Sequence, residues 1–176
     1  MLDLKSLIRS IPDYPKPGIL FRDITTLIEH PQGFKESVER LADAHRGLGI
    51  THVAGIEARG FIFGAGVAIE MGVGFVPIRK RGKLPGATIG QNYTLEYGVD
   101  TIEIHADVLS SVHKVLLIDD LIATGGTAVA AVGLLRRTGA IVENAGFVID
   151  LFDLGGADKL RALGVKIESL VPFAGH

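Results

Sequence analysis

The sequence contains no cysteine, and its formal net charge is only −2 at pH 7. The lack of cysteine excludes disulfides, zinc–thiolate sites and cysteine nucleophiles together. A chain without a disulfide framework is expected in the cytoplasm. Because positive and negative charges nearly cancel, no overall field draws the protein toward nucleic acid or anionic lipid, and we expect neither as a partner.

Long apolar runs are also missing. No uncharged stretch approaches the ~20 residues that cross a bilayer as a helix. The first five residues, Met1 to Lys5, include an acid and form no continuous apolar segment, which is unlike a signal peptide. The sequence therefore predicts neither a membrane span nor a signal peptide.

Glycine is what the sequence has in excess, at 23 of 176 residues, where about 7% is usual. The glycines do not follow the collagen period, and with proline they stay below the share typical of low-complexity chains. At this length a single domain is the default, so we predict one domain over residues 1–176. The glycines are then expected where the backbone turns tightly or approaches a neighbour closely.

Apolar runs and helical periodicities alternate along the chain, with short connections between them. Strands are predicted over 52–56, 75–78, 115–118, 141–149 and 165–171, and helices over 2–10, from 31 to the glycines at 47 and 49, and over 61–71, 126–137 and 156–163. The continuous apolar run at 115–118 is typical of a parallel strand that is covered on both faces. This alternation predicts an α/β fold, with helices flanking a central, mostly parallel sheet.

Two segments interrupt the alternation. Residues 11–22 contain three prolines, which predict an ordered but irregular arm because proline removes a hydrogen-bond donor and fixes φ. Residues 81–98 are rich in glycine, proline and polar side chains, as long lid or binding loops are. Residues 93–97 and 101–105 alternate well enough to form the two arms of a hairpin.

The most informative segment runs from Val115 to Thr127, where a buried strand ends in Asp119-Asp120 and a small-residue turn leads into a helix. Ligands of open parallel sheets bind at the carboxyl ends of the strands. The turn at 124–127 lets backbone N–H groups converge at a helix start, which suits a phosphate monoester. The two carboxylates would repel a phosphate, so their expected partners are sugar hydroxyls or water on a divalent cation. The segment predicts a ribose 5-phosphate site.

A plainer interpretation of the same segment stays open on these residues alone. The two acids could mark the end of a strand and the two glycines an ordinary turn, because short glycine motifs recur by chance. Other nucleotide-binding loops are excluded, since the sequence has no G-x-x-x-x-G-K-[ST] and no G-x-G-x-x-G that opens a helix after a strand.

Two further segments place positive charge near expected strand ends. Arg59 follows a buried strand, where an arginine can bind pyrophosphate through two hydrogen bonds, although a solvent-exposed helix start is the alternative. Four cations lie within five residues at Arg79, Lys80, Arg81 and Lys83. Such a cluster is usually a solvated face, but no second basic region or interleaved aromatics point to nucleic acid. A small polyanion explains it better, and we predict Lys80 and Lys83 as pyrophosphate contacts.

The segment 115–127 resembles the phosphoribosyl pyrophosphate motif of the type I phosphoribosyltransferases. Three other stretches resemble the adenine phosphoribosyltransferases within that family: PGILFRDI at 17–24, GIEARGF at 55–61, and RKRGKLPG at 79–86 together with YTLEYG at 93–98. The resemblance covers nearly the whole chain. It implies the type I phosphoribosyltransferase fold, with an N-terminal hood at about 11–30 and a flexible lid hairpin at about 81–105.

The resemblance also implies an activity. It implies a purine salvage enzyme that transfers the 5-phosphoribosyl group from phosphoribosyl pyrophosphate to adenine, forming AMP and pyrophosphate. Mg²⁺ would be the cofactor, brought with the substrate and without a direct protein ligand, and the protein would be a homodimer. Two alternatives stay open: a phosphoribosyltransferase for another purine base, and a regulator that senses phosphoribosyl pyrophosphate without turning it over.

Roles for individual residues follow from the resemblance. It implies that Asp119 and Asp120 hold the ribose hydroxyls, the second also reaching magnesium through water. Arg59 would act in catalysis on the leaving pyrophosphate, and Arg79 would join Lys80 and Lys83 in binding it. The 5-phosphate would be bound by the turn residues Ala123, Thr124, Gly125, Gly126 and Thr127.

The base is expected between the lid and the hood. The resemblance makes Glu96 the acid–base residue near the purine imidazole, although an exposed hairpin glutamate is its ordinary alternative. A carboxylate that closes into a dry site can have its pKa raised toward that task. In the hood, Phe21 would stack on adenine, while the backbone near Leu20 and Arg22 would read the edge of the base.

Overall fold

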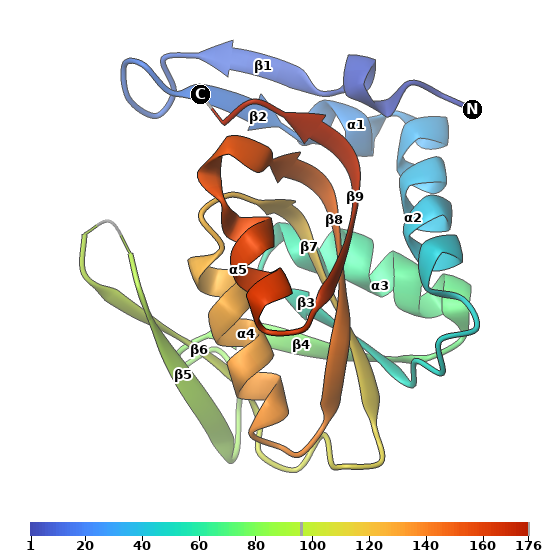
Figure 1. Ribbon diagram of the computed structural model, residues 1–176, viewed down its shortest axis with the longest axis vertical. Helices are drawn as coiled ribbons and strands as arrows, with labels where there is room; N and C mark the ends of the chain where they lie inside the picture. Colours follow the sequence, from blue (N-terminus) through green and yellow to red (C-terminus); the bar gives the residue numbers. More distant parts are fainter. Residues whose placement is uncertain (96, 176) are drawn as a thin grey trace.

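A seven-stranded sheet runs through the computed structural model, within the described residues 1–95 and 97–175 (Figure 1). Its strand order is β5-β6-β4-β3-β7-β8-β9. The bounds of these strands are β3 His52–Ile56, β4 Gly74–Lys80, β5 Thr88–Thr94, β6 Val99–His105, β7 Lys114–Ile122, β8 Ile141–Leu151 and β9 Lys166–Phe173. The strands from β4 through β3, β7 and β8 to β9 pair in parallel, whereas β6 pairs antiparallel with β4 and β5. The predicted α/β fold with a mostly parallel sheet is confirmed.

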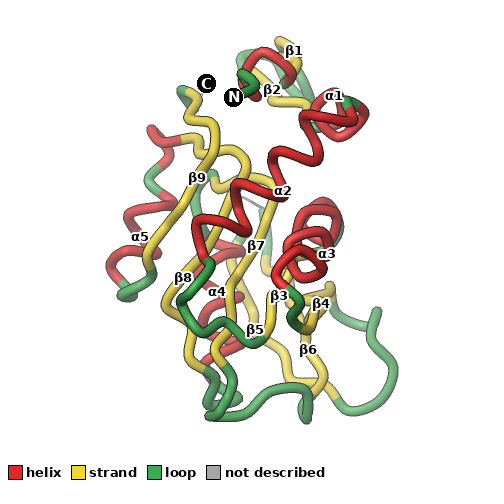
Figure 2. The backbone as a smooth tube through the Cα atoms, turned by 90° about the vertical axis from the view of Figure 1, so that its right-hand side faces the viewer, coloured by secondary structure: helices red, strands yellow, loops and turns green. Residues whose placement is uncertain are grey.

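Helices cover both faces of this sheet. Their bounds are α1 Thr25–Glu29, α2 Pro31–His45, α3 Arg59–Met71, α4 Gly126–Arg136 and α5 Gly156–Ala162. Figure 2 shows α2 and α3 on one side of the strands and α4 and α5 on the other. Each side has its own buried apolar cluster, one containing Leu41, Phe63 and Val67, the other containing Leu134, Leu135 and Leu160. The run 115–118 is fully buried between the two clusters, as the apolar pattern predicted.

The central elements form where the sequence signals lie. The His30 side chain accepts a hydrogen bond from the Gly33 amide, and Pro31 opens α2 at the first helical position. Gly72 ends α3 with a left-handed φ of 68°, a backbone conformation that costs glycine no steric energy. Buried β7 and the glycine-ended helices therefore follow directly from local sequence.

The N-terminal region differs from the prediction of a helix over 2–10 and an irregular arm over 11–22. Only Leu4–Leu7 is helical, as a 3₁₀ turn, and Arg9–Pro12 forms β1, which pairs antiparallel with β2, Leu20–Asp23. An ion pair between Arg9 and Asp23, 2.5 Å between nitrogen and oxygen, joins the two strands. The predicted helix was wrong because this backbone forms its hydrogen bonds with a strand 8 to 14 residues further along the chain, and local periodicity does not reveal such a partner.

The hairpin is also longer than predicted. The first arm, β5, covers Thr88–Thr94 rather than 93–97, and Tyr93 pairs with Asp100 across the hairpin. The second arm, β6, pairs in turn with the end of β4, so the hairpin extends the sheet beyond its parallel part. We call the segment 81–105, which contains this hairpin, the lid, and the segment 11–30 the hood.

The part of the chain that the structure describes contains no helix long and apolar enough to cross a membrane.

Candidate active site

Two adjoining cavities lie at the carboxyl ends of the central parallel strands. The larger, about 390 Å³, extends from the ends of β3 and β4 to the lid. The smaller, about 180 Å³, lies against the loop between β7 and α4. Both cavities are lined by Arg59, Asp119, Asp120 and Thr127. The structure thus brings together the predicted sugar and phosphate contacts and two of the predicted pyrophosphate contacts, Arg59 and Lys80, at the edge where parallel sheets bind ligands.

The loop 123–127 is shaped by contacts between backbone atoms. Gly125 has a φ of 83°, and a Cβ there would lie 2.8 Å from the Cα of Gly156. A Cβ on Gly156 would in turn overlap the carbonyl oxygen of Ala123 and lie 2.8 Å from the Gly125 amide nitrogen. The Gly156 amide donates a hydrogen bond to that same carbonyl, over 3.0 Å. The loop therefore keeps its conformation only while both positions lack side chains.

The start of α4 gives this loop its electrostatic character. Gly125 is the N-cap, and the amides of the first helical turn have no acceptor within the helix. These amides and the positive end of the helix dipole favour an anion at this position. All five predicted phosphate contacts, 123 to 127, line the smaller cavity.

The two acids lie inside β7 rather than after its end, so the predicted strand 115–118 was too short. Asp120 is buried, with 4% of its surface exposed. The Asp119 carboxylate accepts a hydrogen bond from the Asp120 amide, over 2.8 Å. Burial and the neighbouring Asp120 charge raise the pKa of Asp119 well above its usual range. One of the two carboxyls is thereby favoured in its protonated form, in which it can donate a hydrogen bond.

Arg59 is the first residue of α3, two positions earlier than the predicted helix start. Its Nε donates to the buried Asp120 carboxylate over 2.5 Å, while half of the arginine side chain remains exposed. The next residue, Gly60, lies against β7, where a Cβ would approach the Asp119 carboxylate to 2.6 Å. The absence of a side chain at Gly60 thus lets α3 start directly beside the two acids.

The basic cluster divides into residues that reach the cavity and residues that do not. Lys80 lines the larger cavity, and its Nζ donates to Asp100 of the lid over 2.7 Å. Arg79, one position earlier on β4, donates instead to both carboxylate oxygens of Glu57, each over 3.2 Å. This contact holds the pKa of Glu57 below its usual range. Neither Arg79 nor Lys83 lines either cavity.

The base-contacting residues predicted in the hood do not line these two cavities either. Phe21 packs edge-on against Tyr14, with ring centroids 5.2 Å apart. Arg22 lies over the ring of Phe173, 4.3 Å from its centroid. The remaining predicted catalytic residue, Glu96, lies outside the described residues.

One contact between the hood and the lid involves a lysine and a tyrosine. The Lys16 ammonium lies over the ring of Tyr97, 4.8 Å from the ring centroid. This contact joins the turn between β1 and β2 to the tip of the lid.

Three residues at the site were missed by the sequence prediction. Tyr93 lines the larger cavity and donates its hydroxyl to Asp100 over 3.2 Å. Lys159 of α5 donates to the carbonyl oxygen of Thr124 over 2.8 Å, and Gly156 packs under the same loop. The Gly155-Gly156 pair was the available signal, since paired glycines mark a close backbone approach, but its partner lies some 30 residues away in the sequence.

Comparison with known proteins agrees with this arrangement. Residues 24–153 match the family model described as a phosphoribosyl transferase domain. The chain is also 58% identical over 173 residues to the adenine phosphoribosyltransferase of Pectobacterium carotovorum, covering 98% of this chain and 94% of that protein. The chain belongs to the adenine phosphoribosyltransferase family.

Solved structures of other adenine phosphoribosyltransferases share the whole fold. The enzyme from Thermoanaerobacter pseudethanolicus is 46% identical and superposes with a TM-score of 0.92, over 97% of this chain and 98% of that one. The enzyme from Saccharomyces cerevisiae, 37% identical, gives a TM-score of 0.88 over 96% of each chain. Its structure contains adenine and an imino-altritol bisphosphate. The sheet edge where the two cavities lie is therefore part of a fold shared with solved adenine phosphoribosyltransferases.

Proposed function

We propose that this protein transfers the 5-phosphoribosyl group of phosphoribosyl pyrophosphate to adenine, which yields AMP and pyrophosphate. The observation that carries the proposal is the shared lining of the two cavities, where an anion-binding helix start adjoins two carboxylates and an arginine. That set matches the parts of one substrate: a 5-phosphate, sugar hydroxyls and a pyrophosphate. The adenine in the yeast relative's structure supports the choice of base.

The loop 123–127 would hold the 5-phosphate, and Asp119 and Asp120 the ribose hydroxyls. A raised pKa suits Asp119 to this task, because a protonated carboxyl donates to one hydroxyl while its neighbour accepts from the other. Bound at both points, the ribose has its anomeric carbon fixed, and positioning of this kind lowers the barrier to displacement.

Arg59 and Lys80 would bind the departing pyrophosphate. In the structure each is paired with an acid, Arg59 with Asp120 and Lys80 with Asp100. The half-exposed guanidinium can turn from Asp120 to pyrophosphate, and this would release the carboxylate for the sugar. Neutralisation of the leaving group is the main electrostatic contribution expected in such a reaction.

The adenine would lie between hood and lid, with Leu20, Phe21 and Arg22 on one side and Glu96 on the other. The base nitrogen then displaces pyrophosphate with inversion at the anomeric carbon, through an oxocarbenium-like transition state. Glu96 would take up or share the proton that adenine must lose. Closure of the lid would exclude water, which would otherwise capture the ribosyl cation.

Magnesium belongs to the proposal as a companion of the substrate. Within residues 1–95 and 97–175, no three His, Cys, Asp or Glu side chains gather into a metal site. Asp119 and Asp120 do place carboxylate oxygens at the cavity, the donors that Mg²⁺ takes. Asp119 and Asp120 would hold an ion that arrives on the pyrophosphate, with Asp120 reaching it through water as the family resemblance implies. When bound, the ion adds positive charge to the leaving group.

Two broader expectations accompany the proposed activity. A homodimer follows from the family resemblance, and sedimentation at several protein concentrations tests it. A cytoplasmic location follows from the cysteine-free composition, and cell fractionation tests that.

A base-selectivity assay tests the proposed function. The protein is incubated with phosphoribosyl pyrophosphate, Mg²⁺ and adenine, hypoxanthine or guanine in turn, and the nucleotide and pyrophosphate are quantified. We expect AMP and an equal amount of pyrophosphate with adenine, and no turnover after chelation of the metal. Comparable use of hypoxanthine or guanine would show that the choice of base is wrong. No turnover with any base would favour the regulator that binds phosphoribosyl pyrophosphate without reacting it.

A further inference from the structure

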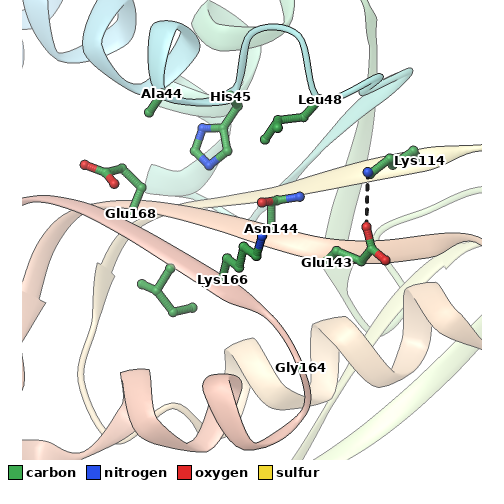
Figure 3. A pocket seen from close by; sticks show the side chains of 10 residues that line it. Ala44, His45, Leu48, Lys114, Glu143, Asn144, Gly164, Lys166 and Glu168 are labelled. Atoms are coloured by element: carbon green, nitrogen blue, oxygen red, sulfur yellow. Dashed lines mark ion pairs between the residues drawn. The ribbon is translucent and has the colours of Figure 1, made fainter.

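Another cavity lies at the opposite edge of the sheet, at the amino ends of β7, β8 and β9 and under the end of α2. Its volume is about 470 Å³, within the range of pockets that hold small organic ligands. Figure 3 shows His45 of α2 above Asn144 of β8, with Lys166 and Glu168 of β9 on the strand below. The phosphate loop and the acids of β7 lie at the other end of the same strands.

Two polar side chains in this cavity are almost completely buried. His45 has 3% of its surface exposed and Asn144 has 6%. The His45 Nδ1 donates to the carbonyl oxygen of Leu41 over 2.7 Å, and Figure 3 shows the other ring nitrogen, Nε2, directed toward Asn144. In the neutral ring Nε2 is then an acceptor.

Within residues 1–95 and 97–175 the Asn144 side chain makes no hydrogen bond to another side chain, and its amide atoms are not sealed from solvent but open to the cavity. Asparagine offers one donor and one acceptor side by side. A donor and an acceptor that are open to a cavity in this way can form hydrogen bonds with a ligand that fills it. A ligand in the cavity thus meets two acceptors, the His45 Nε2 and the Asn144 amide oxygen, and one donor, the Asn144 amide nitrogen.

The absence of a side chain at Gly146 makes room for the His45 ring. A Cβ on Gly146, two residues beyond Asn144 on the same face of β8, would lie 3.4 Å from the His45 ring and closer still to Ile118 and Leu41. Glycine at this position leaves room for the imidazole over the strand. The fold therefore positions His45 and Asn144 as the polar part of the cavity lining.

The remaining lining decides the charge and shape of the ligand. Lys114 is paired with Glu143 over 3.1 Å, and the neighbouring Lys166 and Glu168 bring one charge of each sign, so the lining is neutral overall. Apolar walls come from Ala44, Leu48 and Ile167. A neutral ligand with a flat apolar body and a polar edge fits this lining better than a phosphate or a metal ion.

We propose that this cavity binds a nucleoside whose base carries an exocyclic amino group. The edge of such a base presents an amino donor next to a ring-nitrogen acceptor, which pairs with both atoms of the Asn144 amide. The second amino hydrogen faces the Nε2 acceptor of His45. The ribose hydroxyls lie toward Lys166 and Glu168 at the mouth. Adenosine and cytidine both have this edge, whereas inosine and uridine carry a carbonyl oxygen in place of the amino group.

Nuclear magnetic resonance of the full ¹⁵N-labelled chain at pH 8 tests the proposal. Adenosine, cytidine, inosine and uridine are titrated separately, with ribose 5-phosphate and pyrophosphate present to fill the site at the carboxyl edge. We expect saturable shifts of the Asn144 side-chain amide with adenosine, cytidine or both, and at least ten-fold weaker binding of inosine and uridine, whose oxygen faces the His45 acceptor. Equal binding of the amino and oxo nucleosides, no binding, or shifts confined to residues 123–127 would overturn it.

Two variants locate the site independently. Asn144→Leu keeps the approximate volume and removes the amide edge, and we expect at least ten-fold weaker binding. Leu48→Trp narrows the mouth of the cavity. Leu48 is half-exposed and lies outside the buried core, so we expect this variant to fold even where Asn144→Leu does not. We expect it to bind the nucleoside with a similar loss of affinity. Circular dichroism checks folding of both. Unchanged affinity in a folded variant would contradict the site.

Discussion

The two sides of the cavity at the carboxyl edge are built in different ways. The phosphate loop is held by backbone atoms that meet at Gly125 and Gly156, so nothing in it can rotate aside. The lid side is held by side chains, where Lys80 and Tyr93 both reach Asp100 and more than half of the lysine side chain is exposed. The comparison teaches that one side is fixed before substrate arrives, whereas the other can rearrange around it. We therefore expect substitutions in the loop to impair binding, substitution of Glu96 in the lid to impair the chemical step, and loss of the exposed lid contacts to have only small effects.

The largest effect is expected on the lid side. Glu96→Gln removes the acid–base function and keeps the shape of the side chain, so kcat is expected to fall about 10²- to 10⁴-fold. The KM for phosphoribosyl pyrophosphate should change less than three-fold, about 0.6 kcal/mol. Steady-state kinetics with adenine and phosphoribosyl pyrophosphate varied in turn measure both parameters. Losses of similar size in kcat and affinity would remove the proposed role.

The next effect is expected on the loop side. In Gly156→Ala the new methyl group overlaps the Ala123 carbonyl, so the loop must shift, and a displacement near 1 Å can cost about 10²-fold in kcat/KM. The free energy of unfolding should fall by about 1–3 kcal/mol, as for other overpacked sites. Kinetics and urea denaturation measure the two effects.

Gly133→Ala is the matched control for that loop variant. Gly133 lies in α4, where a Cβ would meet nothing within 4 Å. Its replacement should leave kinetics unchanged and stabilise the helix by up to about 1 kcal/mol. If Gly156→Ala behaved like this control, the rigidity of the loop would not matter for binding.

A smaller effect is expected at the boundary between the two sides. Arg59→Ala removes a charged contact to pyrophosphate, and a charge-assisted hydrogen bond of about 1.5–3 kcal/mol corresponds to roughly 10- to 160-fold weaker product inhibition by pyrophosphate. Arg59→Lys keeps the charge but not the planar guanidinium, and should give an intermediate loss. Inhibition constants for the three proteins measure this series. An unchanged constant in Arg59→Ala would exclude the contact.

The smallest effect is expected where the lid is tied to β4. Asp100→Asn removes the carboxylate that raises the pKa of Lys80 and holds its ammonium. An exposed ion pair is worth about 0.2–1 kcal/mol, so the KM for phosphoribosyl pyrophosphate should rise no more than about five-fold. Lys35→Ala, which removes the exposed Lys35–Glu39 pair on α2, is the control and should leave this KM unchanged. A rise of more than 50-fold in this KM for Asp100→Asn would mean that the lid is held as rigidly as the loop.

Local signals in the sequence account for the central part of the fold. The apolar run at 115–118 and the glycines after α2 predicted elements that the structure contains. Strand β1 was missed because its partner β2 is distant in sequence, and a short segment with a proline at its end reads as irregular when taken alone.

The candidate site was predictable to a similar extent. Asp119, Asp120 and the loop 123–127 meet because the ends of neighbouring parallel strands share one edge. Lys80 was predicted as a pyrophosphate contact from the sequence and Arg79 from the family resemblance, yet of these two only Lys80 lines the cavity. Alternation along a strand places consecutive side chains on opposite faces, and Glu57, which binds Arg79, becomes its neighbour only once β3 and β4 have paired.

The contact between Lys16 and Tyr97 holds the hood and the lid together only weakly. A cation over an exposed aromatic ring contributes about 0.5–1 kcal/mol, close to the thermal energy RT. Contact between hood and lid at this point therefore favours the joined form by only about two- to five-fold. Such a population ratio means that this contact alone would not keep hood and lid joined, and at any instant an appreciable fraction of molecules would lack it.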